Sequence, residues 1–223
     1  MAASFLHSQF VFNWRRNPPA ILGTLILVVC TVLVAFGPLL VRQNPYDLTQ
    51  LNLMDSFLPP AWLEGGNPAY LLGTDGQGRD LVAAIVYGAR ISALIGLSAM
   101  ALACTIGTTL GLIAGFYGGR VDALIMRVAD VQLSFPSMLI ALFLMSAFGT
   151  GIDKVLIALT AVGWVVYART VRGSTLGEVQ KEYVQAARVA GLSNARIIVK
   201  HVLPNVLTPL IVIATVQVGT FIL

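Results

Sequence analysis

Charged residues are scarce in this chain of 223 residues. Lys, Arg, Asp and Glu make up 11% of the sequence and hydrophobic residues 57%, whereas about 25% of an ordinary soluble domain is charged. A soluble protein this apolar would need a core larger than the chain can enclose, so the composition predicts a membrane protein. The net charge of +4 does not indicate nucleic-acid binding, because the basic residues are spread between hydrophobic segments.

Side chains that could build a catalytic or metal site are equally few. The two histidines, His7 and His201, belong to a terminal tail and a polar segment, and the two cysteines, Cys30 and Cys104, fall inside apolar runs. We interpret the cysteines as small packing residues. The chain has no G-x-x-x-x-G-K-[ST] loop to cradle the phosphates of ATP. These absences argue against a membrane enzyme, and we expect no catalytic residue, no cofactor and no metal site.

Long uncharged runs are what the sequence does contain. The 22 residues from Ala20 to Val41 carry no charge and would form a helix of about 33 Å, enough to cross a bilayer. A cleavable signal peptide is the alternative, but this run is too long for one, so we favour an anchor helix. Four further apolar runs follow: Ile91–Tyr117, Leu133–Phe148 with a kink expected at Pro136, Val155–Ala168 continuing to Val171, and Thr208–Leu223. The pattern predicts an all-α polytopic membrane protein with five spans, the fifth incomplete.

Small residues recur at every fourth position of the second run. They are Ala99, Ala103, Gly107, Gly111 and Gly115. This spacing lines them along one helix face, and such faces let two helices approach closely in lipid. The predicted helix-packing residues are Ala103, Gly107, Gly111 and Gly115. The partner helix could belong to this chain or to another subunit, and the sequence does not separate the two.

Polar side chains near the predicted spans are few, and we interpret them as structural. No charged residue lies deep in a span, so a proton-driven transporter, which would need an intramembrane ionisable site, is disfavoured. Arg127 and Asp130 stand three residues apart and could pair on one helix face. Gln132 and Ser134 lie in the same stretch.

The segment 42–88 is rich in proline, glycine and acidic residues, which indicates an extramembrane connection with little regular structure. It closes on a compact polar motif: Gly73, Thr74, Asp75, Gly78, Arg79 and Asp80. We expect Thr74 or Asp75 to cap the helix that follows. The three glycines indicate tight turns here, because no Lys-Ser or Lys-Thr follows them to make a phosphate loop.

The basic residues set the orientation. If the N-terminus is cytoplasmic and the spans alternate, ten lie inside: Arg15, Arg16, Arg120, Arg127, Arg169, Arg172, Lys181, Arg188, Arg196 and Lys200. Four lie outside: Arg42, Arg79, Arg90 and Lys154. This asymmetry agrees with the positive-inside rule. It predicts that the segment 42–88 is extracytoplasmic and that the polar segment after the fourth run is cytoplasmic.

That polar segment, Glu182–Pro204, is here called the elbow. We expect a helix over Glu178–Ala190 that ends at Gly191, and a second helix that is capped by Ser193 and stopped by Pro204. Small residues at 186, 187, 190 and 191 would give the turn a flat surface that fits a groove on a partner. An amphipathic helix resting on anionic lipid is the alternative.

The elbow resembles the EAA loop of permease subunits of binding-protein-dependent ABC importers. The matching residues are Gln185-Ala186-Ala187, Gly191 and His201-Val202-Leu203-Pro204. Gln185 replaces the usual acid and His201 the usual isoleucine, and both departures, with Asn205, resemble the dipeptide/oligopeptide/nickel branch. Three more stretches agree with this branch: 72–80, 87–92, and 115–119 with Asp122, Arg127, Asp130 and Pro136. The segment Pro59-Pro60-Ala61-Trp62 is similar to the C-type subunit of dipeptide importers.

The resemblance implies a type I ABC importer transmembrane fold with six spans, so the rest of the fifth and a sixth are expected beyond Leu223. It divides the chain into residues 1–88 (tail, anchor helix and extracytoplasmic loop) and 89–223 (permease core, C-terminally truncated, with the EAA loop at 178–205). The implied protein is a multi-pass subunit of the bacterial inner membrane, and not an enzyme.

The implied partners are a second related permease in a heterodimer, two ATP-hydrolysing subunits, an extracytoplasmic solute-binding protein and membrane lipid, with no nucleic acid. The residues that the resemblance assigns to ATPase coupling are Glu182, Gln185, Ala186, Ala187, Gly191, His201, Leu203 and Pro204. The implied cargo is a dipeptide or short oligopeptide. A nickel complex or glutathione remains an alternative, as does, more remotely, a proton-coupled transporter.

Overall fold

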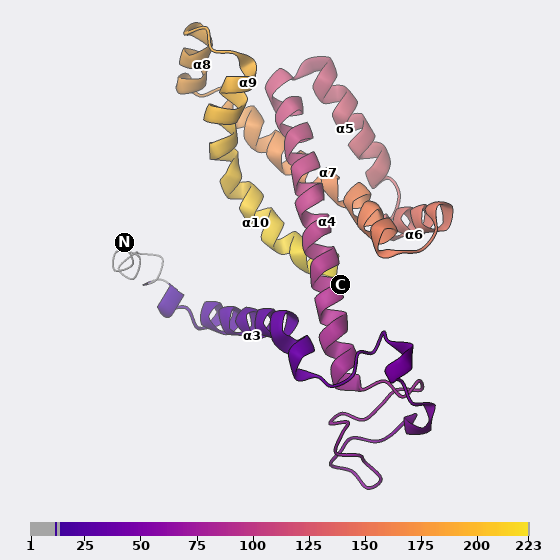
Figure 1. Ribbon diagram of the computed structural model, residues 1–223. Coiled ribbons are helices and arrows are strands. Elements are labelled where there is room, and N and C mark those ends of the chain that lie inside the picture. Colours follow the sequence, from indigo (N-terminus) through magenta and orange to yellow (C-terminus); the bar gives the residue numbers. More distant parts are fainter. Residues whose placement is uncertain (1–11, 13, 223) are drawn as a thin grey trace. The chain divides into compact units, whose positions relative to one another are not determined.

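The computed structural model of the chain describes residue 12 and residues 14–222. These residues form helices and no β-strand; the one β-bridge described among them is isolated and joins Thr74 to Asp80. The predicted all-α membrane fold is confirmed (Figure 1). The chain divides into two compact units, Met1–Ala93 and Leu94–Leu223, and the boundary falls inside one long helix.

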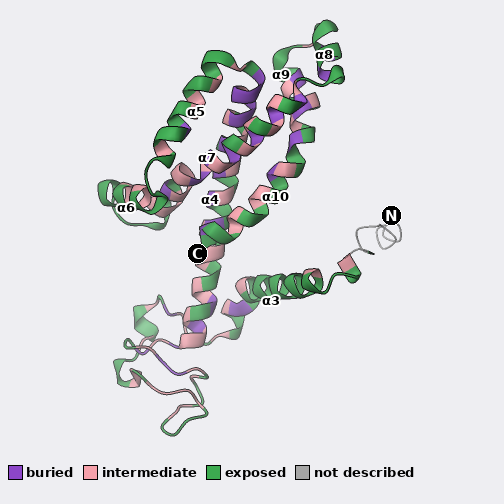
Figure 2. Cartoon of the chain, turned by 180° about the vertical axis from the view of Figure 1, so that it is seen from behind, coloured by how far each residue is buried: buried purple, intermediate pink, exposed green. Residues whose placement is uncertain are grey.

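The first long helix of the first unit is the anchor helix α3, Pro18–Leu40, which opens on prolines at its first positions and is exposed along nearly its whole length (Figure 2). Proline is tolerated there because the first amide groups of a helix have no intrahelical acceptor. Two 3₁₀ turns, η1 (Leu48–Gln50) and η2 (Leu53–Asp55), are the only helical turns of the loop that follows, within its described residues. Helix α4 then starts at Leu81.

The second unit holds the rest of α4 (Leu81–Tyr117) and the helices after it. They are α5 (Gly119–Leu133), α6 (Ser137–Phe148), α7 (Ile152–Glu178), α8 (Glu182–Val189), α9 (Asn194–Ile197), the π-helix η3 (Ile198–Val202) and α10 (Leu203–Ile222). Both α6 and α10 pack against α7. Helix α7 is therefore central to this unit.

Four of the described helices are long and apolar enough to cross a membrane, and α5 with α6 would make a fifth crossing if this pair is one broken span. Two predicted helix ends and the kink expected at Pro136 were wrong. The second helix starts at Leu81 instead of Ile91, and α7 continues past Val171 to Glu178. Pro136 breaks the third span with an 89° bend instead of kinking it, because proline removes a backbone donor and clashes with the preceding turn.

The small-residue face of α4 packs on α7, within this chain. A Cβ added at Gly111 would lie 2.5 Å from the carbonyl oxygen of Ala168, and one at Gly107 would lie 2.4 Å from that of Trp164. Gly115 meets Thr175 in the same way, and Ala103 is fully buried. This face therefore packs on α7 of the same chain, and a contact with another subunit stays a prediction.

Candidate functional site

The elbow, Glu182–Pro204, consists of α8, a turn, α9, the π-helix η3 and the first two residues of α10. Its first helix was predicted to start at Glu178, and this was wrong: α7 ends at Glu178 and α8 begins at Glu182. Lys181 is extended (φ −71°, ψ 147°), which breaks the helical path between them. The Gln185 side chain donates a 2.8 Å hydrogen bond to the Val179 carbonyl oxygen, which compensates for a helical bond lost at the break.

Gly191 ends α8 as predicted. It has φ +75°, a left-handed conformation that glycine adopts without the steric cost of a Cβ. The amide of Leu192 donates to the Ala187 carbonyl (3.2 Å), and the amide of Gly191 to the Arg188 carbonyl (3.0 Å). These bonds satisfy the last carbonyl groups of α8. Ser193 occupies the N-cap position of α9, but its side chain makes no capping hydrogen bond.

Pro204 does not stop the second helix, contrary to the prediction. The chain stays helical from Asn194 to Ile222 and widens into the π-helix η3 just before Pro204. The ring of a proline clashes with the carbonyl four residues earlier, which here is Lys200 inside η3. A wider turn relieves this clash, and single π turns are frequent at functional sites.

The side chains of the elbow divide into a buried face and an exposed face. Val184 is fully buried, and Ala187, which is 6% exposed, packs in the same core cluster as Ile197 and Val202. Ala187 is therefore an inward packing residue and not part of the flat outer surface. Its spacing of three from Val184 is the signal that could have indicated this.

The other predicted coupling residues lie at varied depths. Glu182, Gln185, Ala186, Gly191 and Pro204 are exposed, whereas His201 and Leu203 are half-buried. Val189, which sequence reasoning missed, is 90% exposed at the last position of α8. The exposed residues at the end of α8 and in the turn are Ala186, Arg188, Val189, Ala190 and Gly191, and Val189 is the one large apolar side chain among them.

A polar cluster connects the elbow to the helices on both sides. The Tyr183 hydroxyl donates to a carboxylate oxygen of Glu178, the last residue of α7. The Asn205 amide in α10 donates to the Tyr183 hydroxyl oxygen (3.1 Å) and to the His201 carbonyl oxygen (2.8 Å). Lys181 pairs with Glu178 at 2.7 Å. Burial, and then the hydrogen bond to Glu178, raises the pKa of Tyr183 to about 12, so its hydroxyl remains a donor at neutral pH.

Ion pairs tie α5 to α7. The guanidinium of Arg172 binds both carboxylate oxygens of Asp122, one of them at 2.6 Å, and Arg169 binds Asp130. The predicted pairing of Asp130 with Arg127 was therefore wrong, because α7 supplies the nearer cation. Gln132 donates to the Val162 carbonyl (3.0 Å) and accepts from the Trp164 indole (2.9 Å). These bonds join α5 to α7, and a structural role for these polar groups stays a prediction.

The motif 73–80 forms a closed turn at the end of the loop between α3 and α4. The carboxylate of Asp75 accepts the amides of Gln77 (2.8 Å) and Arg79 (3.0 Å) and pairs with the Arg79 guanidinium at 3.0 Å. Asp80, and not Thr74 or Asp75, caps α4, because its carboxylate accepts the Val82 amide at 2.9 Å. Buried Thr74 accepts from the Leu58 amide (2.9 Å) and donates to the Asp55 carbonyl instead. Gly73 and Gly78 are buried, with φ of +80° and +71°.

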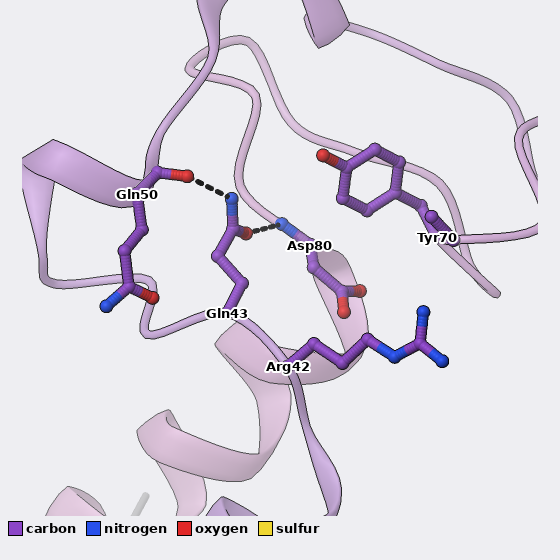
Figure 3. A pocket seen from close by; sticks show the side chains of 6 residues that line it. Arg42, Gln43, Gln50, Tyr70 and Asp80 are labelled. Atoms are coloured by element: carbon purple, nitrogen blue, oxygen red, sulfur yellow. Dashed lines mark hydrogen bonds between the residues drawn. The ribbon is translucent and has the colours of Figure 1, made fainter.

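A polar hollow of about 490 Å³ lies beside this turn, lined by Arg42, Gln43, Gln50, Ala69, Tyr70 and Asp80 (Figure 3). The Gln43 amide crosses its floor, accepting from the Asp80 amide (2.7 Å) and donating to the Gln50 carbonyl (3.0 Å). This bridge joins the chain just after α3 to the start of α4. We interpret the hollow as a feature of the loop's own architecture. Across the residues the structure describes, no group of three His, Cys, Asp or Glu could hold a metal ion.

Acidification should open the turn around Asp75. Burial acts to raise the pKa of Asp75, but the amides of Arg79 and Gln77 and the Arg79 guanidinium outweigh it and hold this pKa below its usual range. The carboxylate therefore stabilises the turn above the unfolded pKa of about 3.9, and this stability disappears as pH falls through the lower folded pKa. We expect hydrogen-exchange protection of the Gln77 and Arg79 amides, corrected for intrinsic exchange, to fall below pH about 4.

The Ala69 amide supplies the control, because its acceptor at 2.9 Å is the neutral side chain of Asn67. Its protection should not follow the same titration. Equal pH dependence at Ala69 and Gln77 would contradict a role for the Asp75 charge.

Comparison with known families identifies the chain. The family model described as "Binding-protein-dependent transport system inner membrane component" matches residues 107–223, more than half of the chain, including the whole elbow. The chain belongs to this family. A second model, described as the N-terminal TM domain of oligopeptide transport permease C, matches residues 6–60 of the permease. The resemblance inferred from the sequence is thereby confirmed, and the permease is a multi-pass inner-membrane component.

Curated relatives cover nearly all of the permease. It is 37% identical over 215 residues to the dipeptide transport system permease protein DppC of Haemophilus influenzae. The aligned region covers 96% of this chain and 72% of the relative. It is 38% identical to the di/tripeptide transport system permease protein DppC of Pseudomonas aeruginosa (96% and 70% covered). For the DppC protein of Escherichia coli the identity is 41% (96% and 71% covered).

Proposed function

We propose that this permease is the membrane subunit of an ATP-driven importer that moves dipeptides or short oligopeptides across the bacterial cytoplasmic membrane. The proposed cargo rests on the relatives, whose names describe dipeptide, di/tripeptide and oligopeptide transport. The partners would be two ATP-binding subunits, a second related permease and an extracytoplasmic binding protein, which the family description supports in part. ATP hydrolysis would take place on the ATP-binding subunits.

The exposed face of the elbow is the observation that carries the coupling role. Val189 projects beside the small exposed residues Ala186, Ala190 and Gly191. One apolar side chain on a flat surface can fill a pocket of a partner, and such buried anchors supply much of the binding energy of an interface. The excess of basic residues on this side favours a cytoplasmic elbow and a cytoplasmic N-terminus.

The elbow stands between two apolar helices, α7 and α10, that are long enough to span a membrane. Closure of the ATP-binding subunits would displace α8, and the displacement would tilt α7 and α10. The free energy of ATP binding enters as a difference in affinity of the partner for two conformations of the permease. The substrate path needs no ionisable group of its own in this scheme, because the binding protein selects the cargo.

Affinity purification of the tagged permease from membranes tests the proposal. We expect recovery of two ATP-binding subunits and a related permease, and peptide uptake that stops when ATP is depleted. Uptake that survives ATP depletion and collapses with the proton gradient would overturn the proposed energy source. Uptake of a nickel complex or of glutathione, with no uptake of labelled dipeptides or oligopeptides, would overturn the proposed cargo.

Val189→Asp is the sharpest variant for the docking face. Placing a charge in an apolar pocket should reduce recovery of the ATP-binding subunits by at least about tenfold, whereas recovery of the second permease should not change. Met54→Asp is the matched control, because Met54 is also 90% exposed but lies on the extracytoplasmic loop. Normal recovery with Val189→Asp would place the docking face elsewhere.

A further inference from the structure

Tyr183 lies where three elements of the permease meet. Its hydroxyl bonds Glu178 at the end of α7 and receives the Asn205 amide from α10, while Tyr183 itself belongs to α8. The hydroxyl also lies 3.3 Å from the carbonyl oxygen of His201 in η3. One hydroxyl group thus connects the elbow to both of the long helices beside it.

The π-helix η3 leads directly into this junction. Its ladder has a five-residue spacing, with the Leu203 amide bonded to the Ile198 carbonyl. The carbonyl of His201, which belongs to η3, accepts the Asn205 side chain at 2.8 Å. Asn205 has two amide hydrogens, and it directs one at His201 and the other at Tyr183.

The backbone segments on the two sides of α8 are too flexible to transmit a displacement by themselves. Residues 179–181 and 190–193 are outside any helix, so the chain can bend on both sides of α8. The buried side chains of Val184 and Ala187 hold α8 to the core, but apolar contact is non-directional. Hydrogen bonds fix distance and angle, and those to an ionised group are the strongest.

We propose that Tyr183, with Glu178 and Asn205, forms the rigid joint through which displacement of α8 is transmitted to α7 and α10. This inference rests on the proposed function of the elbow. All three are positioning residues: they hold the elbow in register with the helices and touch neither ATP nor cargo. Tyr183 and Asn205 do not belong to the exposed docking face, so the joint assigns them a separate role.

Tyr183→Phe tests the joint by removing one oxygen atom. The assembled importer, with its ATP-binding subunits, second permease and binding protein, is reconstituted in proteoliposomes, and peptide moved per ATP hydrolysed is measured. We expect this ratio to fall about tenfold, as for loss of a hydrogen bond to a charged group, while the ATPase rate stays within about twofold. A purely stabilising role would leave the ratio unchanged and lower only the yield.

Tyr167→Phe is the matched control. The Tyr167 hydroxyl is buried in the same unit and has no hydrogen-bond partner in the described part of the chain. Removing the Tyr167 hydroxyl should not change the ratio of peptide moved to ATP hydrolysed. Glu178→Gln keeps a neutral acceptor for Tyr183 and should lower the ratio less than Glu178→Ala, which removes the acceptor. If the Tyr183→Phe complex does not assemble, Asn205→Ala, which breaks the same joint from α10, decides the question by the same ratio.

The outcomes separate the joint from the docking face. Loss of ATP-binding subunits with Val189→Asp, together with a normal ratio for both Tyr183→Phe and Asn205→Ala, would overturn the joint alone. Normal recovery with Val189→Asp would overturn the docking face. If the joint acts as one unit, the double variant Tyr183→Phe/Asn205→Ala should lower the ratio no further than the more damaging single variant.

Discussion

Gly111→Val is expected to destabilise the second unit of the permease strongly. A Cβ at this position would lie 2.5 Å from the Ala168 carbonyl oxygen and 2.9 Å from the Val171 Cβ. Backbone atoms cannot rotate away as a side chain can, so α4 and α7 must separate. Overpacking of a core costs about 1–3 kcal/mol even where side chains can yield, and we expect roughly 3 kcal/mol or more here. Thermal unfolding of the detergent-purified protein measures the loss.

Gly173→Ala is the control for Gly111→Val. Gly173 lies in α7, and an added Cβ there meets nothing within 4 Å. Replacing an open glycine in a helix by alanine should raise stability by about 0.5–1 kcal/mol. The same direction of change at both positions would contradict the close approach of α4 and α7 at Gly111.

Asp122→Lys is expected to release α5 from α7. Arg172 binds both carboxylate oxygens of Asp122, and the substitution places two cations together. The pair is only partly buried, since the Arg172 side chain is 33% exposed and that of Asp122 17%. Exposed pairs contribute about 0–1 kcal/mol and broken buried pairs cost about 3–5 kcal/mol, so we expect a loss of about 1–3 kcal/mol. Faster hydrogen exchange over α5 is the direct observation.

Charge reversal provides the control for this prediction. The double variant Asp122→Lys/Arg172→Glu restores opposite charges at the same two positions, and it should recover at least half of the lost stability. Asp130→Asn, which weakens the neighbouring exposed pair with Arg169, should cost less than Asp122→Lys. A double variant no more stable than Asp122→Lys alone would show that the two residues do not interact.

Features that act within a few residues predicted the local structure correctly. Gly191 ends α8 because a left-handed residue favours glycine whatever surrounds it, and the long apolar runs are helices of spanning length. The prediction that Pro204 ends a helix was wrong. Proline is a strong stop signal, but widening the helix over Ile198–Val202 relieves its clash and preserves the helical path into α10.

The charged residues also show what a local pattern does not predict. Asp130 could have paired with Arg127 one turn away, yet it bonds Arg169, 39 residues further along the chain. Asp122 and Arg172 are 50 residues apart. Such pairs depend on which helices pack together, and a sequence pattern does not contain that information.

By itself, the sequence determined that the chain lies in a membrane as helices, where the elbow turns at Gly191, and which permease family the chain belongs to. These follow from composition and from short motifs, whose physics acts within a few residues. Only the tertiary structure decided that the small face of α4 packs on α7, that Ala187 points inward while Val189 projects, and that Tyr183 joins three helices. Each of these depends on contacts between distant segments, and those contacts exist only once the helices have packed.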